Sequence, residues 1–462
     1  MPLKSINPAT GETFAQFEEL TDFQLEEKIA VAHAQYQTWR TRSFEERARP
    51  MFALANLLRE RKRELAEVAS LEMGKPIKQA LGEVEKCAWV CEYYAQETAH
   101  ILAPEKVATD AQLSYVRFDP IGVILAVMPW NFPYWQVFRF AAPAAMAGNV
   151  GVLKHASNVP QCAAKIEELF DAAGFPKGVF QNLAIGSSRV ERVLRDARVV
   201  AATLTGSEYA GTQVARICGE EIKKTVLELG GSDPFIVLAD ADLDAVAKAG
   251  SLARLQNAGQ SCIAAKRFIL VRDIADRVIA GFKEKFEAMR VGDPLDEQTD
   301  MGPMVDEKSL LEVDRIVKES VARGARLITG GARLSRAGFF YAPTILSNVQ
   351  KGMPAYEEET FGPVMSVIVV ENDQEAVRVA NDSRFGLGAS LWTHDLKHAQ
   401  ALAKKIESGC VFVNGMVKSD PRLPFGGIKK SGYGRELAGY GIKEFVNIKT
   451  VWIAAPSFDK KP

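Results

Sequence analysis

The sequence predicts an α/β protein with two parallel-sheet domains and a small additional β element. From residue 122 onward, short apolar runs alternate with helical patterns, which is typical of parallel strands covered by helices on both faces. The alternation starts again near Pro234, which indicates a second sheet. A chain of 462 residues also exceeds what one hydrophobic core can hold.

The N-terminal part, residues 22 to 103, is predicted to be helical. Apolar residues recur there at three- and four-residue spacing with charges between them. Thr21 and Ser43 are suitable N-caps, and Pro50 is expected to kink or restart the second helix. The helices are expected over residues 23–39, 44–59, 64–73 and 77–96.

The first sheet is expected from residue 122 to residue 228. Its ligand should bind beyond the carboxyl ends of the strands, where parallel α/β sheets place their ligands. Helices over 161–173 and 209–219 would cover the sheet. The predicted strands are 123–128, 150–154, 180–184, 199–204 and 224–228.

The second sheet and the additional β element are predicted from the same kinds of sequence pattern. The run 445–453 alternates like a strand but has no local partner. It is expected to pair with the alternating run 113–122, or with these elements of a second subunit. The second sheet is predicted to contain strands 235–238, 268–271, 325–329, 364–370 and 411–414, with helices 243–256, 274–289 and 310–323.

Composition excludes several classes of function. The net charge of −1 leaves no basic surface for nucleic acid and no polybasic membrane patch. The charge-poor stretch 120–153 is interrupted by proline and asparagine, so no membrane helix is predicted. Six cysteines without CxxC spacing, and a polar start over residues 1–12, lead us to expect reduced thiols in the cytoplasm. The five histidines form no HExxH motif, and no metal site is predicted.

Three residues are candidates for catalysis. Cys262 follows Gly259–Gln260–Ser261, where an accessible thiol can act as a nucleophile, although a small core residue in a turn is the alternative. Glu228 ends an apolar strand, where a raised pKa would suit a general base; an ion-paired or capping glutamate is the alternative. Asn131 follows the first strand and can donate to an oxyanion, or can simply form a turn.

The phosphate-binding signals are weaker. Neither GxGxxG nor GxxxxGK[ST] occurs in the sequence. The candidates are Lys154, after the second strand, and Thr205–Gly206–Ser207, where a helix N-terminus and a hydroxyl can meet a phosphate. An ordinary capped helix start would explain the second of these equally well.

Seven motifs together resemble those of the NAD(P)-dependent aldehyde dehydrogenase superfamily. They occur in the family's order and extend over nearly the whole chain, although each alone is unspecific. The motifs are Pro129–Trp130–Asn131–Phe132–Pro133, Gly174–Phe175–Pro176–Lys177–Gly178–Val179, Thr205–Gly206–Ser207, Glu228–Leu229–Gly230–Gly231, Gly259–Gln260–Ser261–Cys262, Glu359–Thr360–Phe361–Gly362–Pro363 and Pro424–Phe425–Gly426–Gly427.

The resemblance implies a mechanism and a domain plan. Cys262 would attack an aldehyde, the Asn131 amide and the Cys262 N–H would hold the oxyanion, and Glu228 would activate the water that releases the acid. Residues 1–112 and 123–228 would bind the cofactor, 229–430 would carry catalysis, and 113–122 with 431–462 would pair subunits into a homodimer or homotetramer. The implied cofactor-binding residues are Trp130, Lys154, Ser157, Ser207, Glu208, Leu229 and Glu359.

Two departures from the family pattern concern specificity. Many members carry a glutamate, which would repel a 2′-phosphate, where this chain has Ser157; NADP is therefore expected, with NAD as the alternative. Arg139 and Ser419 resemble carboxylate-binding residues of succinate semialdehyde dehydrogenases, but Gln256 stands where some members have a second arginine.

The expected function is the oxidation of succinate semialdehyde through a Cys262 thioester. The first alternative is the same chemistry on an uncharged aliphatic or aromatic aldehyde. A non-catalytic protein that reuses the fold is the second, and the presence of Cys262, Glu228 and Asn131 argues against it. A cysteine hydrolase would need a histidine base and leaves the cofactor motifs unexplained.

Overall fold

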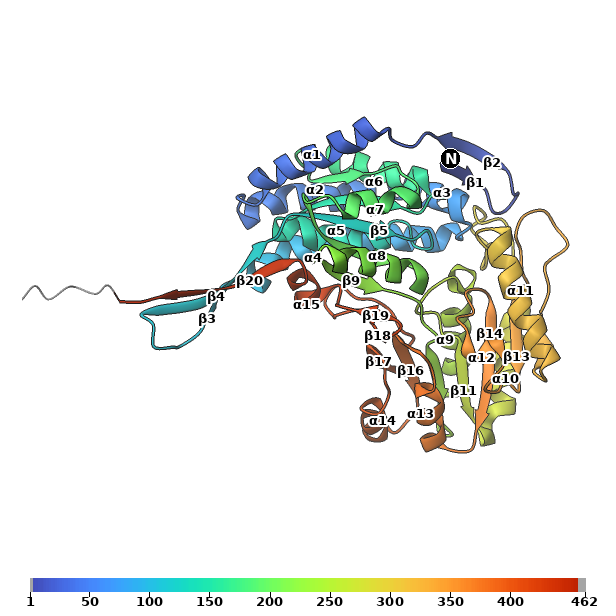
Figure 1. Ribbon diagram of the computed structural model, residues 1–462. Helices are drawn as coiled ribbons and strands as arrows, with labels where there is room; N and C mark the ends of the chain where they lie inside the picture. The colour runs from blue at the N-terminus through green and yellow to red at the C-terminus, as the bar shows by residue number, and fades with distance from the viewer. Residues whose placement is uncertain (1–2, 456–462) are drawn as a thin grey trace, which may run out of the picture.

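The computed structural model describes residues 3–455, and it contains two α/β lobes and a projecting β ribbon (Figure 1). The first lobe holds a six-stranded sheet in the order β19-β9-β8-β5-β6-β7. Its strands are parallel except for β19, which pairs antiparallel with β9. The bounds are β5 Val123–Met128, β6 Val150–His155, β7 Phe180–Asn182, β8 Val199–Thr205, β9 Lys224–Glu228 and β19 Gly432–Tyr433.

Helices cover this sheet. The predicted N-terminal helices are confirmed, and both Thr21 and Ser43 form reciprocal capping boxes with the third helical residue. Pro50 does not restart the second helix, which continues through it while burying Met51 and Leu54. The helices of this lobe are α1 Asp22–Trp39, α2 Phe44–Glu60, α3 Lys62–Met73, α4 Ile77–Ile101, α5 Trp135–Ala147, α6 Pro160–Ala172, α7 Val190–Leu194 and α8 Glu208–Glu220.

The second lobe holds a seven-stranded sheet in the order β12-β13-β14-β11-β10-β16-β17. All five predicted strands are present, and β13 and β16 add to them. The strands are β10 Pro234–Val237, β11 Arg267–Val271, β12 Arg326–Thr329, β13 Thr344–Ser347, β14 Val364–Val370, β16 Gly388–Trp392 and β17 Cys410–Val413. The helices are α9 Leu243–Leu255, α10 Arg272–Glu287, α11 Glu307–Ala322, α12 Pro354–Glu357, α13 Asp373–Asn381 and α14 Leu396–Ala403.

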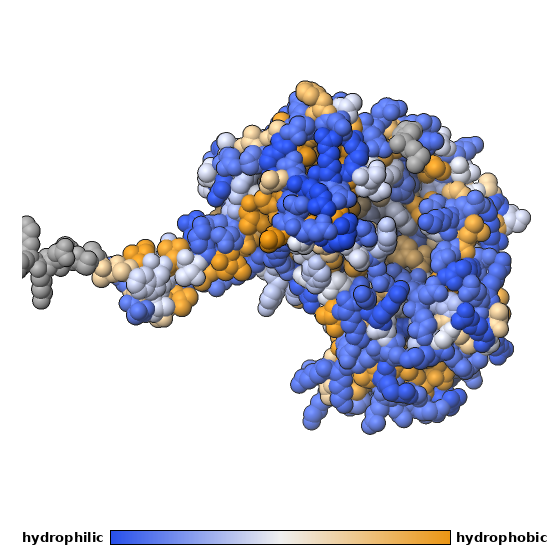
Figure 2. Space-filling model, viewed as in Figure 1, coloured by the Kyte–Doolittle hydropathy of each residue, from blue (hydrophilic) through white to orange (hydrophobic). Residues whose placement is uncertain are grey.

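The ribbon forms within one chain. Strand β4 (Leu113–Pro120) pairs antiparallel with β20 (Val446–Ile453) along its whole length, and β3 (Glu105–Lys106) joins β4. The two alternating runs of the sequence therefore pair with each other. The ribbon projects from the body, and apolar side chains lie open along it (Figures 1 and 2).

The remaining short elements attach to the two lobes. The hairpin β1 (Leu3–Ile6) with β2 (Thr13–Phe17) precedes α1, and β15 (Phe385–Gly386) pairs with β18 (Ile428–Lys429). Residues 431–462 were expected to belong to the ribbon, but two elements of this range lie elsewhere. Strand β19 belongs to the six-stranded sheet, and α15 (Ala438–Lys443) packs against α5. Within the described part of this range, only β20 extends the ribbon. Residues 1–2 and 456–462 of the expected ranges lie outside the described residues. No helix within residues 3–455 is long and apolar enough to cross a membrane.

Candidate functional site

The predicted site residues stand in a row at the carboxyl ends of neighbouring strands. Strand order and register place Glu228 at the end of β9 beside Thr205 at the end of β8. Trp130 and Asn131 follow the next strand, β5, and Lys154 lies near the end of β6. The topology thus brings together segments that are about 100 residues apart in sequence, as expected for a parallel sheet.

The loop before Cys262 has an unusual backbone that buried cations hold in place. Asn257 and Ala258 both have left-handed backbone angles, with φ of 53° and 52°. Arg254 donates to the carbonyls of Gly259 (2.6 Å) and Gly362 (2.6 Å), so it ties the cysteine loop to the loop that follows Glu359. Such a residue conformation persists only where its surroundings enforce it.

A second buried cation, Lys266, supports the cysteine itself. Its Nζ donates to the carbonyls of Ser261 (2.9 Å) and Cys262 (2.8 Å) and lies 3.4 Å from Glu359. These bonds fix the backbone around the thiol on both sides. The sequence offered no sign of this role, since Lys266 follows the motif and its spacing is unremarkable.

Cys262 lies where two cavities meet. One cavity, of about 310 Å³, is lined by Lys86, Trp135, Arg139 and Ser419; the other, of about 300 Å³, is lined by residues of the expected cofactor set. Burial raises the pKa of the Cys262 thiol to about 12, and the charges of Arg139 and Lys266 act against that rise. A thiol at this junction can be approached by two ligands from different sides.

Asn131 lies against the cysteine loop. Its Nδ2 donates to the Gln260 carbonyl at 3.1 Å, and the Asn257 amide donates to the Asn131 carbonyl at 2.8 Å. The side chain is buried, and Asn131 lines the same cavity as Cys262. An amide nitrogen has two protons, so the second N–H remains to stabilise an oxyanion at the cysteine.

Glu228 belongs to a buried group of three charged side chains. It lies beside Gly426 and lines neither of the two cavities that meet at Cys262. Burial, together with the nearby Glu436 carboxylate, raises the pKa of Glu228 well above its ordinary value, and Arg139 opposes this. Arg139 forms an ion pair with Glu436 rather than with Glu228. Arg435 opposes the rise as well, but no ion pair or hydrogen bond joins either arginine to Glu228, so burial and the Glu436 charge determine the direction of the shift.

The expected cofactor residues divide into two groups. Four of them, Trp130, Ser207, Leu229 and Glu359, line the second cavity. Ser207 caps α8 by accepting from the Ala210 N–H (3.3 Å), and Glu359 accepts from the Gly231 N–H (3.0 Å). This group combines apolar walls, a helix N-terminus and a carboxylate.

The other three expected cofactor residues lie outside that cavity. Lys154 is buried within β6, and its pKa is lowered by burial. Ser157 is exposed in the turn that follows β6. Glu208 pairs with Arg384 at 3.0 Å and does not line the cavity.

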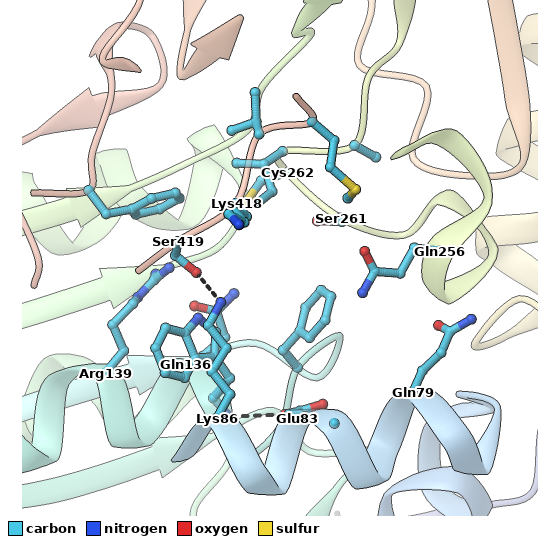
Figure 3. A pocket seen from close by; sticks show the side chains of 18 of the residues that line it. Gln79, Glu83, Lys86, Gln136, Arg139, Gln256, Ser261, Cys262, Lys418 and Ser419 are labelled. Carbon is cyan, nitrogen blue, oxygen red and sulfur yellow. Dashed lines mark hydrogen bonds between the residues drawn. The ribbon is translucent and has the colours of Figure 1, made fainter. Parts of the chain in front are cut away.

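The first cavity contains more polar side chains than the sequence indicated (Figure 3). Ser419 is buried and accepts a hydrogen bond from Lys86 Nζ at 2.7 Å. Gln136 is buried and lines both cavities. Arg139 also lines the cavity, but its guanidinium pairs with Glu436 and donates to Thr205 (3.2 Å), so its role toward a substrate stays a prediction. Sequence reasoning missed Lys86 and Gln136, because nothing in their spacing distinguishes them from other polar helix residues.

Comparisons with known proteins agree with this geometry. The sequence model described as "Aldehyde dehydrogenase family" matches residues 1–451. The succinate-semialdehyde dehydrogenase [NADP(+)] 1 of Mycobacterium tuberculosis is 52% identical over 457 residues, which cover 98% of this chain and 100% of that protein. The NADP-dependent succinate-semialdehyde dehydrogenase of Mycobacterium avium is 51% identical, over 98% of this chain and 97% of that protein.

Solved structures give the same result. The succinic semialdehyde dehydrogenase of Streptococcus pyogenes, solved with NADP+ as the cofactor, superposes with a TM-score of 0.96 at 41% identity, over 98% of this chain and all of that chain. A cysteine at the junction of two cavities, on this topology and with matches over nearly the full length, leads to one conclusion: this chain belongs to the aldehyde dehydrogenase family.

Proposed function

We propose that the protein oxidises succinate semialdehyde to succinate with NADP+. The observation that carries this proposal is the cavity beside Cys262, whose lining combines three cationic side chains, those of Lys86, Arg139 and Lys418, with the buried hydroxyl of Ser419. A short aldehyde with a carboxylate at its far end fits such a lining. The names of the mycobacterial and streptococcal relatives support the same substrate and cofactor.

The second cavity suits a dinucleotide. Trp130, Leu229 and Phe361 offer flat and apolar surfaces for a nicotinamide ring, Glu359 offers a carboxylate for ribose hydroxyls, and the N-terminus of α8 suits a pyrophosphate. Lys154 and Ser157, one strand further along the sheet, would meet the adenosine 2′-phosphate. When bound, the cofactor supplies a hydride acceptor.

The protein's own groups carry the remaining chemistry. The Cys262 thiol releases its proton to solvent, the resulting thiolate attacks the aldehyde carbon, and the oxyanion forms within reach of the Asn131 amide. Loss of hydride from this adduct leaves a thioester on Cys262. Glu228 then takes a proton from a water molecule whose oxygen attacks the thioester, and the acid leaves as the thiol is restored.

The environment of Glu228 imposes a condition on these reaction steps. Burial and Glu436 raise the pKa of its carboxyl group, and the side chain lies beside Gly426 and lines neither cavity at Cys262, so it must ionise and move toward Cys262 before it can act as a base. Both oxygens lack a hydrogen-bond partner, so no bond holds the side chain in place.

We further propose that the protein assembles from copies of itself in the cytoplasm. The ribbon of β4 and β20 exposes Leu113, Ile448, Trp452 and Ile453, and a paired subunit would cover them. The six cysteines are all free, which suits a reducing compartment.

Initial rates test the proposal. We expect kcat/KM for succinate semialdehyde to exceed that for pentanal, which is uncharged and of similar length, and NADP+ to be preferred over NAD+. A higher kcat/KM for pentanal would instead favour an enzyme for uncharged aldehydes, for which the apolar walls Phe132, Trp135 and Ile263 would be the binding surface.

A further inference from the structure

The partners of Arg139 leave it little free charge for a carboxylate, and a third cation of the lining, Lys418, is exposed to solvent rather than partly buried like Lys86. Its guanidinium pairs with Glu436, donates to Thr205 and lies 4.8 Å from the centre of the Phe425 ring. A buried arginine that is already paired with a carboxylate has little remaining attraction for a second one. The neighbouring position 256 holds a neutral glutamine.

Lys86 has the opposite properties. It stands on α4 and points into the cavity, where its Nζ donates to Ser419 Oγ at 2.7 Å and lies 4.2 Å from the centre of the Trp135 ring (Figure 3). Among the residues that the structure describes, no carboxylate is at ion-pair distance from it.

The two carboxylates whose charges act on Lys86 are already engaged. Glu83 accepts from the N–H groups of Tyr134 and Trp135, both at 2.9 Å, and pairs with Lys75. Asp420 pairs with Arg422 at 2.7 Å. A partly buried ammonium without a counter-ion, facing a ligand cavity, is a site built for an anion.

We propose that Lys86, together with the Ser419 hydroxyl, binds the distal carboxylate of the substrate, and that Arg139 instead neutralises Glu436. The proposal rests on the proposed function and names the residue that gives it selectivity. Some relatives have a second arginine at position 256, where this chain has Gln256; Lys86 thereby supplies a positive charge that this glutamine does not. The Ser419 hydroxyl, which accepts from Lys86, can rotate to donate its own proton to a carboxylate oxygen.

This assignment has a consequence for protonation. Burial and the charge of Arg139 on α5 lower the pKa of Lys86 to about 8 in the empty pocket. Asp420, on the loop that follows β17, and Glu83 and Cys87, on α4 itself, act in the opposite direction. A bound carboxylate stabilises the ammonium, so binding should raise the pKa of Lys86 and take up a proton at pH 8 to 9.

The kinetic test compares three variants. Lys86→Met keeps an unbranched side chain, only one atom shorter, that can still pack on Trp135, but it removes the charge. We expect KM for succinate semialdehyde to rise on the order of 30-fold or more, while KM for pentanal changes less than about 3-fold. Lys86→Arg should restore most of the preference. The control is Lys78→Met, an exposed lysine on the same helix that pairs with Asp300, and it should behave like the wild type.

A measurement without turnover tests the same contact. Succinate binding to the enzyme should be followed by calorimetry at pH 8.5 in two buffers of different ionisation enthalpy. The wild type should take up a fraction of a proton per succinate, and Lys86→Met should bind succinate more weakly with no uptake. The melting temperature of Lys86→Met should equal or exceed that of the wild type, because a buried charge has been removed.

The outcomes separate this proposal from the proposed function. A wild type that does not prefer succinate semialdehyde over pentanal contradicts the function. A wild type with the preference whose Lys86→Met variant retains it overturns the role of Lys86. The role of Lys86 would also be overturned if KM rose equally for both aldehydes in Lys86→Met. The same holds if KM for succinate semialdehyde rose in Lys418→Met and not in Lys86→Met.

Discussion

At the scale of single residues, the environment of Cys262 sets the chemistry. Burial raises the pKa of its thiol to about 12 and outweighs the opposing charges of Arg139 and Lys266. We expect Cys262→Ala to abolish aldehyde oxidation while NADPH binding, followed by fluorescence, stays within about 3-fold of the wild type. Turnover near the wild-type rate would rule out covalent catalysis. Cys410→Ala, which removes another partly exposed thiol, is the matched control.

Glu228 allows a test of both its role and its protonation. Glu228→Gln should still release one equivalent of reduced cofactor in a rapid burst and then stall, because the thioester is no longer hydrolysed. Stopped-flow absorbance at 340 nm would show the burst. Steady turnover at the wild-type rate would remove Glu228 as the base.

Glu228→Gln should also change the pH dependence of the stability of the protein, in a direction that follows from the pKa shift. The folded-state pKa of Glu228 is raised above its ordinary value of 4.5, so its contribution to stability is full at low pH and is lost as the pH rises from about 4.5 through the folded-state pKa. Glutamine does not titrate. The melting temperature of Glu228→Gln relative to the wild type should therefore increase between pH 5 and pH 8, as scanning calorimetry can measure.

We expect Ser157 to influence the choice between NADP+ and NAD+. It is exposed in the turn after β6, one strand away from Trp130. Ser157→Glu should lower kcat/KM with NADP+ by at least about 10-fold and change kcat/KM with NAD+ little or raise it, since a carboxylate would face the 2′-phosphate. An equal loss of kcat/KM with both cofactors would mean that the turn supports the fold and does not select the cofactor.

At the scale of elements, the cysteine loop depends on Arg254. This side chain is fully buried and donates to three backbone carbonyls at 3.0 Å or less, those of Gly259, Ala265 and Gly362. Arg254→Met would leave these carbonyls unpaired, and we expect the free energy of unfolding to fall by about 3 kcal/mol in urea titrations. Arg272→Met, which removes an exposed pair with Glu371, should change it by less than about 1 kcal/mol.

The elements themselves were largely predictable from the sequence, and the contents of the site were not. Apolar runs and caps gave most strands to within about two residues, because their signals are local. Strands β13 and β16 were missed; Gly388–Trp392 begins with glycine and alanine, which are uncommon in strands, whereas Thr344–Ser347 is no shorter than strands that were predicted. Lys86 and Glu436 could not be found in the same way, because their roles depend on which helix and which loop pack against each other.

At the scale of the whole molecule, the proposed assembly depends on the exposed apolar residues of the ribbon. Ile448 and Trp452 are 61% and 52% exposed on β20. Ile448→Lys should weaken assembly, so that light scattering at micromolar concentration reports a larger fraction of single chains of about 50.6 kDa. Asn447→Lys, on the same strand and also exposed, is the control. An unchanged mass in Ile448→Lys would show that subunits do not associate through this residue.

The meeting of two cavities at one sulfur atom also affects the order of events in turnover. Because the aldehyde and the dinucleotide would approach Cys262 from different cavities, neither has to pass the other, and the acid can depart while the reduced cofactor is still bound. Dicarboxylate products would then compete with the aldehyde for free enzyme but not with the cofactor. An accumulating metabolite of this kind would slow the enzyme without displacing its cofactor, so the enzyme would resume turnover as soon as the acid is consumed.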